Sequence, residues 1–148
     1  MKRIFIDHEK CEGCKNCSIA CMQAHCESPG TVYDLDLLDG KNEARHRITN
    51  NRKGGYVPVF CRHCEKPECV DSCMSGALKK DPATGHVQYD EKRCGTCFMC
   101  VAACPYGNVK PDKLTRSKII KCDFCKNDNE DPHCVKSCPK KAINVEEV

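Results

Sequence analysis

The feature that most constrains this chain is the spacing of its cysteines. Sixteen of the 17 cysteines fall into four groups of four, and only Cys26 lies outside them. Groups one and three have the spacing C-x2-C-x2-C-x3-C, whereas groups two and four open with C-x2-C, lengthen the next gap and close with C-x3-C. In order, the groups are Cys11, Cys14, Cys17 and Cys21; Cys61, Cys64, Cys69 and Cys73; Cys94, Cys97, Cys100 and Cys104; and Cys122, Cys125, Cys134 and Cys138.

The four groups repeat as two pairs. Segments 4–7 and 87–90 lead into groups one and three at the same distance before the first cysteine. Segments 67–73 and 132–138 are identical at five of seven positions and end groups two and four. Each pair is a group with the C-x2-C-x2-C-x3-C spacing followed by a group with the lengthened gap. Duplication of one small unit is therefore the natural interpretation.

The composition leaves little material for an apolar core. Cysteine makes up about 11 % of the 148 residues, above the roughly 8–10 % that already marks a chain as unusual. Without the cysteines, the hydrophobic share falls from 40 % to about 29 %, and the chain has no Trp. Small chains in this position are held together by disulfides or by metals.

The expected compartment favours metals. Segment 1–10 is charged again after three apolar residues and lacks the apolar region of a signal peptide. No segment approaches the roughly 18–20 apolar residues that span a bilayer. We therefore expect a cytoplasmic protein without membrane insertion, in which thiols stay reduced and dense cysteines bind metal.

Four cysteines within eleven residues favour iron–sulfur clusters over zinc. A cubane cluster takes four thiolates, and in two-cluster ferredoxins the last cysteine of each group ligates the other cluster. Because C-x2-C pairs also occur in zinc sites, a zinc-binding structural module is the alternative from another class. A cluster with four cysteine ligands carries about −2, so four clusters change the formal net charge from +3 to about −5. We therefore expect no nucleic-acid partner.

Only a few short elements can be predicted. Segments 4–7 and 142–145 are expected to form strands. Segments 77–80 and 86–89 flank the turn residues Asp-Pro-Ala-Thr-Gly and are expected to form a hairpin. Short helices are expected where the C-x2-C-x2-C runs end. The polar stretch 26–56 is expected to be a linker or a loop that faces a partner.

The chain resembles the four-cluster ferredoxin-type iron–sulfur subunits of the dimethyl sulfoxide reductase and formate dehydrogenase group. Within that group it is most similar to the short soluble electron-transfer proteins that serve carbon monoxide dehydrogenase and hydrogenase. The likeness covers nearly the whole chain except 26–56. One departure is that Met22 and Met74 follow groups one and two, whereas a proline follows groups three and four. The likeness is carried by 67–73, 76–78, 81–85, 100–107, 121–125 and 134–139.

The resemblance implies four [4Fe–4S] clusters and a ligand set for each. In this scheme group one shares its last cysteine with group four, and group two shares with group three. Set A is Cys11, Cys14, Cys17 and Cys138; set B is Cys21, Cys122, Cys125 and Cys134; set C is Cys61, Cys64, Cys69 and Cys104; and set D is Cys73, Cys94, Cys97 and Cys100.

The same resemblance implies an α+β fold of two bacterial dicluster ferredoxin-like domains, related by internal duplication, with few short strands and helices around a metal-cluster core. The outer domain, 1–56 plus 108–148, holds sets A and B, and the inner domain, 57–107, holds sets C and D. Cys26, His25, His63 and His133 are expected to lie outside the ligand sets, where the histidines can still tune a cluster's potential.

The expected function is electron transfer without catalysis, because no residues suggest a nucleophile–base pair or an open metal position. The resemblance implies a catalytic oxidoreductase subunit as donor: carbon monoxide dehydrogenase first, then hydrogenase, formate dehydrogenase or an aldehyde oxidoreductase. The implied acceptor is a flavoprotein, a ferredoxin or a hydrogenase. A free polyferredoxin without a fixed partner is a second alternative.

Overall fold

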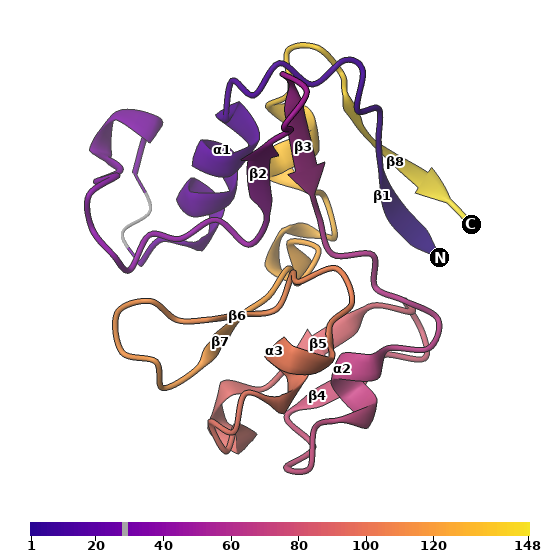
Figure 1. Ribbon diagram of the computed structural model, residues 1–148. Helices are drawn as coiled ribbons and strands as arrows, with labels where there is room; N and C mark the ends of the chain where they lie inside the picture. Colours follow the sequence, from indigo (N-terminus) through magenta and orange to yellow (C-terminus); the bar gives the residue numbers. More distant parts are fainter. Residues whose placement is uncertain (28–29) are drawn as a thin grey trace.

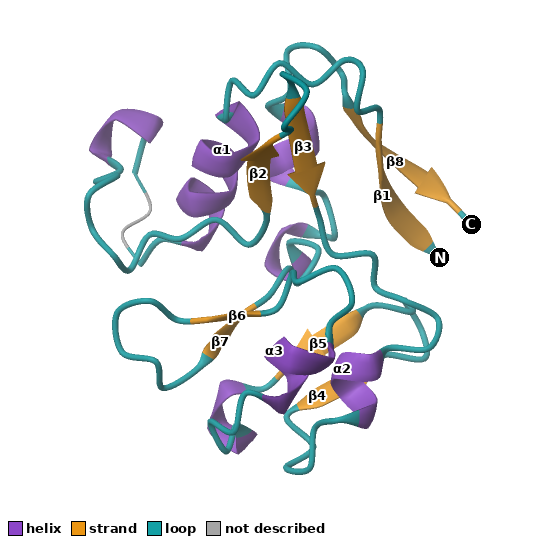
Figure 2. Ribbon diagram, viewed as in Figure 1, coloured by secondary structure: helices purple, strands orange, loops and turns teal. Residues whose placement is uncertain are grey.

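The structure is a computed structural model that describes residues 1–27 and 30–148. It has two lobes, and Figure 1 shows α1, β1, β2, β3 and β8 in one lobe and α2, α3 and β4 to β7 in the other. Figure 2 shows that loops connect all of these short elements. The helices are α1 (Asn16–His25), α2 (Glu68–Asp71), α3 (Met99–Ala103) and α4 (His133–Lys136), with 3-10 turns at Val32–Asp34, Glu91–Arg93 and Lys126–Asp128.

The first and last strands pair with each other. β1 (Lys2–Ile6) and β8 (Ile143–Glu147) are antiparallel, with Ile4 opposite Val145. The backbone N–H of Asp7 extends the ladder by donating to the carbonyl of Ala142 at 2.7 Å. Both strands were predicted from the sequence and are confirmed within two residues. Their pairing brings group one next to group four, as Figure 1 shows for the two ends of the chain.

The predicted hairpin at 77–89 is confirmed. β4 (Leu78–Lys80) and β5 (Val87–Tyr89) pair antiparallel. The Asp81 carboxylate accepts hydrogen bonds from the N–H of Ala83 at 2.9 Å and from the hydroxyl of Thr84 at 3.0 Å. An Asp side chain that binds the backbone two residues later is the usual mechanism by which Asp starts a turn.

Stretch 26–56 differs from the expected linker. β2 (Arg47–Asn50) pairs with β3 (Tyr56–Val59), and the turn between them closes as the N–H of Asn51 donates to Gly55 at 2.8 Å. Ala44 and His46 are buried. The hairpin was missed because its exposed face is polar and proline lies in β3. Residues 28 and 29 of the expected loop lie outside the described residues. The division into 1–56 plus 108–148 and 57–107 stays a prediction, and its first boundary falls inside β3.

Each lobe has a small apolar core that includes cysteines. One core combines Phe60 and Ile143 with Cys17 and Cys134. The other combines side chains of β4, β5, β7 (Ile119–Ile120) and helix α3 with Val109, which directly precedes β6 (Lys110–Pro111). Its buried members are Leu78, Val87, Cys100, Val109 and Ile119. Thiols therefore occupy positions that aliphatic side chains fill in an ordinary core. None of the helices among the described residues is long and apolar enough to cross a bilayer.

Candidate metal centres

Set C surrounds a cavity. The four cysteines line a space of about 200 Å³, together with His63, Asn108 and Lys121. Burial raises the pKa of Cys69 to about 11; the three other thiols of the set act in the same direction, whereas Lys121 opposes them. Because all four cysteines line this one cavity, they are placed to share one cofactor. The structure therefore brings together the four residues that the resemblance assigned to this set.

Set A surrounds a second, smaller cavity. It is lined by the four cysteines of the set, with Ile48 and Pro58 of the β2–β3 hairpin on one side. Burial raises the pKa of Cys17 to about 11, and Cys14 and Cys11 add to this effect. Cys138 reaches the cavity from group four because α1 and α4 contact each other.

Sets B and D are recognised by the interactions among their thiols. Burial raises the pKa of Cys134, and Cys122, Cys21 and Cys125, the rest of set B, add to the shift. Burial likewise raises the pKa of Cys100, and the three other members of set D, Cys73, Cys94 and Cys97, add to it. All sixteen grouped cysteines thus have neighbours from their own set. The assignment of each as a cluster ligand stays a prediction.

The four sets follow each other in a row. Cys134 of set B also interacts with Cys17 of set A. Cys122 of set B interacts electrostatically with Cys61 of set C. Another member of set C, Cys69, packs in one apolar core with cysteines of set D. The order in space is therefore A, B, C, D. Cys14 of set A and Cys97 of set D are the two grouped cysteines that are exposed to solvent.

Groups one and three have the same backbone conformation at equivalent positions. Gly13 and Thr96, which precede the second cysteine, have φ of 67° and 58°. Lys15 and Phe98, which follow it, have φ of 62° and 57°. Left-handed residues next to right-handed ones turn successive N–H groups into one concavity, a nest that binds anions and iron–sulfur clusters. Such a backbone is uncommon for residues with a side chain, so its repetition is a property of the site.

Groups two and four share a second backbone feature. His63 and Phe124 stand before the second cysteine of their groups and have φ of 44° and 59°. Gly76 and Lys141, each the third residue after the last cysteine of its group, have φ of 69° and 49°. The duplication that the sequence suggested is therefore visible in the local conformation around the cysteines.

Backbone N–H groups also donate to the last cysteine of a group. Asn108 donates to Cys104 Sγ at 3.4 Å, and Ala142 donates to Cys138 Sγ at 3.3 Å, in each case from the fourth residue after the cysteine. Hydrogen bonds to a thiolate favour the charged form. The two equivalent cysteines therefore receive the same backbone donor in both halves of the chain.

Cys21 has the most polar surroundings of set B. The N–H of Arg45 donates to its Sγ at 3.3 Å. Burial opposes ionisation of Cys21, but hydrogen bonds from His25 and His46 lower its pKa to about 6. Burial likewise opposes protonation of His25, but its bond to Asp123, at 3.1 Å, raises the pKa of His25 to about 10. Both ring nitrogens of His25 already have partners, Nδ1 the carbonyl of Cys21 at 2.8 Å and Nε2 the carboxylate of Asp123, so His25 helps to hold Cys21 in place.

Two buried polar side chains keep a charge or a hydrogen-bonding atom that the described polypeptide does not balance. His63 Nδ1 accepts the N–H of Val87 at 2.9 Å, while its buried Nε2 has no partner among the described residues. Lys121 is buried, and both of its hydrogen bonds go to backbone carbonyls. Both residues line the cavity of set C. A donor and a cation that face four thiols fit an anionic cofactor there, because buried polar groups are normally paired.

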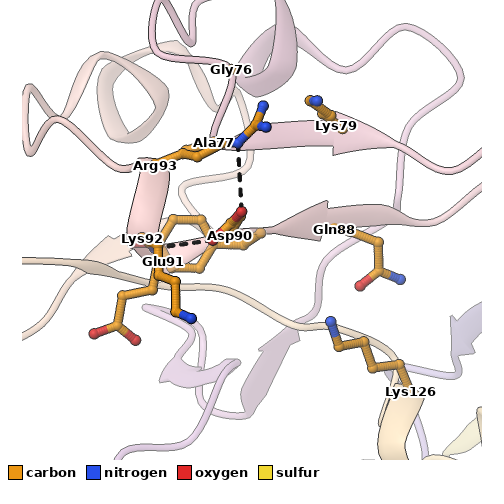
Figure 3. Close-up of a pocket in the computed structure, with 10 residues that line it drawn as sticks. Gly76, Ala77, Lys79, Gln88, Asp90, Glu91, Lys92, Arg93 and Lys126 are labelled. Atoms are coloured by element: carbon orange, nitrogen blue, oxygen red, sulfur yellow. Dashed lines mark hydrogen bonds and ion pairs between the residues drawn. The ribbon is translucent and has the colours of Figure 1, made fainter.

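A charged groove lies beside set D. Figure 3 shows Lys79 and Gln88 from the β4–β5 hairpin, Lys126 across from them, and Arg93 paired with Asp90. The Arg93–Asp90 distance is 3.7 Å. Tyr89 also lines the groove, and burial together with the neighbouring Cys94 raises its pKa. The groove therefore joins a surface of mainly positive charge to the cysteines of set D.

The family model described as "4Fe-4S dicluster domain" matches residues 53–148 of this chain. The chain is 31 % identical to subunit beta of NADH-dependent phenylglyoxylate dehydrogenase from Aromatoleum evansii, with 95 % of this chain and 29 % of that subunit covered. It is 35 % identical to the B subunit of anaerobic dimethyl sulfoxide reductase from Escherichia coli, with 95 % and 70 % covered. It is 30 % identical to the electron transport protein HydN of the same organism, with 95 % and 85 % covered.

A solved structure supports the fold. A chain of the active site complex BamBC of benzoyl coenzyme A reductase, in complex with benzoyl-CoA, matches with a TM-score of 0.55 and 24 % identity. The match covers 99 % of this chain and 79 % of that chain. At this identity the likeness concerns the fold alone. The expected α+β ferredoxin-like fold, with few short strands and helices around cysteines, is confirmed.

Three residues around the sets were not expected from the sequence to contribute to the site. Arg45 and Asp123 meet at 3.2 Å beside Cys21, although they come from distant parts of the chain. Lys121 and Asp123 flank Cys122 in the sequence K-C-D-F-C, which is segment 121–125 of the family resemblance. Their adjacency to a cysteine was the available signal. Their roles depend on long-range contacts that no local pattern records.

Proposed function

This chain belongs to the family of 4Fe-4S dicluster domains, and on that premise we propose that it relays electrons along its four cysteine sets in the order A, B, C, D. As a member of that family it is an electron-transfer subunit that carries [4Fe–4S] clusters, and it is not a catalytic subunit. Its sixteen grouped cysteines suffice for four clusters. When bound, the clusters supply one-electron carriers. The protein supplies the ligands, their order and their surroundings.

The observation that carries the proposal is the exposure of Cys14 and Cys97. They belong to the first and last sets of the row, whereas Cys21, Cys125 and Cys134 of set B are buried. Solvent access at the two ends allows a partner to approach set A and set D. Burial of three set B cysteines shields that internal step from solvent, whereas the four cysteines of set C are half-buried. A row with two accessible ends is suited to a relay between two partners.

The proposed donor is the catalytic subunit of an oxidoreductase: carbon monoxide dehydrogenase, hydrogenase, formate dehydrogenase or an aldehyde oxidoreductase. The names of the relatives support a partner of this kind, since one is a subunit of a reductase and another an electron transport protein. The proposed acceptor is a flavoprotein or a ferredoxin. A location in the cytoplasm remains a prediction.

The groove beside set D supports docking of an acidic acceptor at that end. Lys79, Lys92, Arg93 and Lys126 contribute four positive charges, and Asp90 and Glu91 contribute two negative ones. The holoprotein as a whole is expected to carry about −5. A local positive surface on a negative protein steers an acidic partner to one place. An acidic ferredoxin is therefore the acceptor that we assign to this end.

The decisive experiment is iron and sulfide analysis of the anaerobically purified protein, combined with electron paramagnetic resonance after reduction. We expect about sixteen irons per chain and signals from interacting paramagnetic centres. A colourless protein that contains zinc would support the structural zinc module instead. Anaerobic co-purification tests the partner: a stable complex with a large oxidoreductase supports the subunit, and recovery of the chain alone supports a free polyferredoxin.

A further inference from the structure

Lys121 is a buried cation at the contact between sets B and C. The residue is 3 % exposed. Its Nζ donates to the carbonyl of Val87 at 2.9 Å and to that of Cys122 at 2.8 Å. Cys122 belongs to set B, whereas Lys121 itself lines the cavity of set C. The ammonium group therefore stands where the two middle sets of the row meet.

Within the described part of the chain, no carboxylate forms an ion pair with Lys121. Its two hydrogen bonds go to neutral carbonyls, and an ammonium has three donors. A buried charge without an opposite charge is strongly unfavourable. Lys121 interacts electrostatically with Cys69 of set C and with Cys122 of set B. The negative charge that balances it thus belongs to the two cysteine sets and what they hold.

His63 adds a neutral donor on the set C side. Because Nδ1 accepts the N–H of Val87, the proton of the neutral ring is on Nε2. This N–H is buried and has no acceptor among the described residues. The equivalent position of group four is Phe124, which has no donor. The two halves of the duplicated chain therefore differ at this position in one hydrogen-bond donor.

We propose that Lys121, assisted by the His63 N–H, raises the reduction potentials of the clusters at sets B and C and leaves those at sets A and D unchanged. This inference rests on the ligand sets of the proposed function. Each reduction adds one electron and no proton, so it adds one negative charge. A fixed cation at short range in a buried site stabilises the reduced form more than the oxidised form. Lys121 is thus a tuning residue for the middle of the relay.

The test is a redox titration, followed by electron paramagnetic resonance, of anaerobic holoprotein. Lys121→Gln removes the charge and retains hydrogen-bond donors. We expect two of the four midpoint potentials to become more negative, by at least a tenfold change in the reduction equilibrium, or about 59 mV for one electron. Lys121→Arg keeps the charge and should leave all four potentials in place. Lys41→Gln makes the same charge change at an exposed position and should shift none.

Several outcomes would overturn the inference. Four unchanged potentials in Lys121→Gln would do so, as would an equal shift of all four. In either case the wild-type protein would still show four reducible clusters, and the proposed relay would stand. If Lys121→Gln binds fewer irons, His63→Phe provides the second test. It introduces the residue that group four already uses, and it should lower one potential, that of set C; four unchanged potentials there would also refute the proposal.

Discussion

The ring of Tyr56 lies directly against the α-carbon of Gly13, where the backbone has φ of +67°. Tyr56 begins β3, and Gly13 stands between the first two cysteines of group one. The contact therefore places the β2–β3 hairpin against the loop that carries Cys11 and Cys14. Two constraints meet at Gly13, namely a left-handed backbone and the absence of space for a side chain.

Gly13→Ala should destabilise the protein more than Gly54→Ala does. Both positions have left-handed backbones, which cost a residue with a side chain about 1–2 kcal/mol. A Cβ at Gly54 meets no atom within 4 Å, whereas one at Gly13 overlaps the ring of Tyr56. We expect melting temperatures of the holoprotein to fall by about 2–4 °C per kcal/mol for a chain of this size. Equal losses in the two variants would show that the contact contributes nothing.

Cys21→Ala should remove one cluster, because Cys21 reaches set B from another group. The iron content is expected to fall from about sixteen to about twelve per chain. Cys26→Ala is the matched control: it lies slightly further along the same segment, and its thiol donates to the carbonyl of Gln23 at 3.2 Å. That variant should keep all of the iron. If the variant instead lost the cluster of set A, which Cys11, Cys14 and Cys17 bind, the assignment of Cys21 to set B would be wrong.

Removal of the iron should unfold the chain. Each lobe has only a few buried aliphatic side chains, and thiols complete its core. Metal binding in small domains is coupled to folding, so the free energy of binding becomes folding free energy. We expect anaerobic chelation to abolish the cooperative melting transition and most of the far-ultraviolet circular dichroism. A metal-free chain that still melts cooperatively would show that the polypeptide alone holds the fold.

Charge reversal in the groove should slow electron transfer to an acidic ferredoxin. Lys92→Glu and Arg93→Glu together change the local charge by four units, next to Cys94. Charge patches of this kind commonly change association rates by about 10- to 1000-fold. Stopped-flow measurements should show a slower second-order rate and a weaker dependence on salt. Lys41→Glu and Lys53→Glu are exposed controls outside the groove. A rate unaffected by the groove variants would place docking elsewhere.

The parts of the fold that the sequence predicted are those governed by local chemistry. The hairpin of β4 and β5 followed from Asp81 and Gly85, whose turn preferences depend on their own backbone. The cofactor followed from cysteine spacing, because four thiolates of fixed separation restrict the metal. In both cases the decisive residues are close together in the chain. The fold class followed from the family resemblance.

The parts that were missed depend on contacts between distant residues. The β2–β3 hairpin has polar residues on its outer face, and its inner side is covered by group one through Tyr56. Lys121 and His63 meet at the cavity of set C from segments that are far apart in the sequence. From the sequence, Lys121 was only part of a segment that carries the family resemblance, and His63 was only one of three histidines expected to lie outside the ligand sets. Their importance follows from the structure, in which the buried Nε2 of His63 has no acceptor among the described residues and Lys121 donates only to neutral carbonyls.

The accessibility of Cys14 and Cys97 also determines where the protein is vulnerable. A side chain that a partner can approach is equally open to dioxygen and other small oxidants. Damage on exposure to air should therefore begin at the two ends of the row and reach the buried sulfurs of set B last. The natural partners, once docked, would cover these openings. Assembly into a complex would then protect the cofactors as well as connect them.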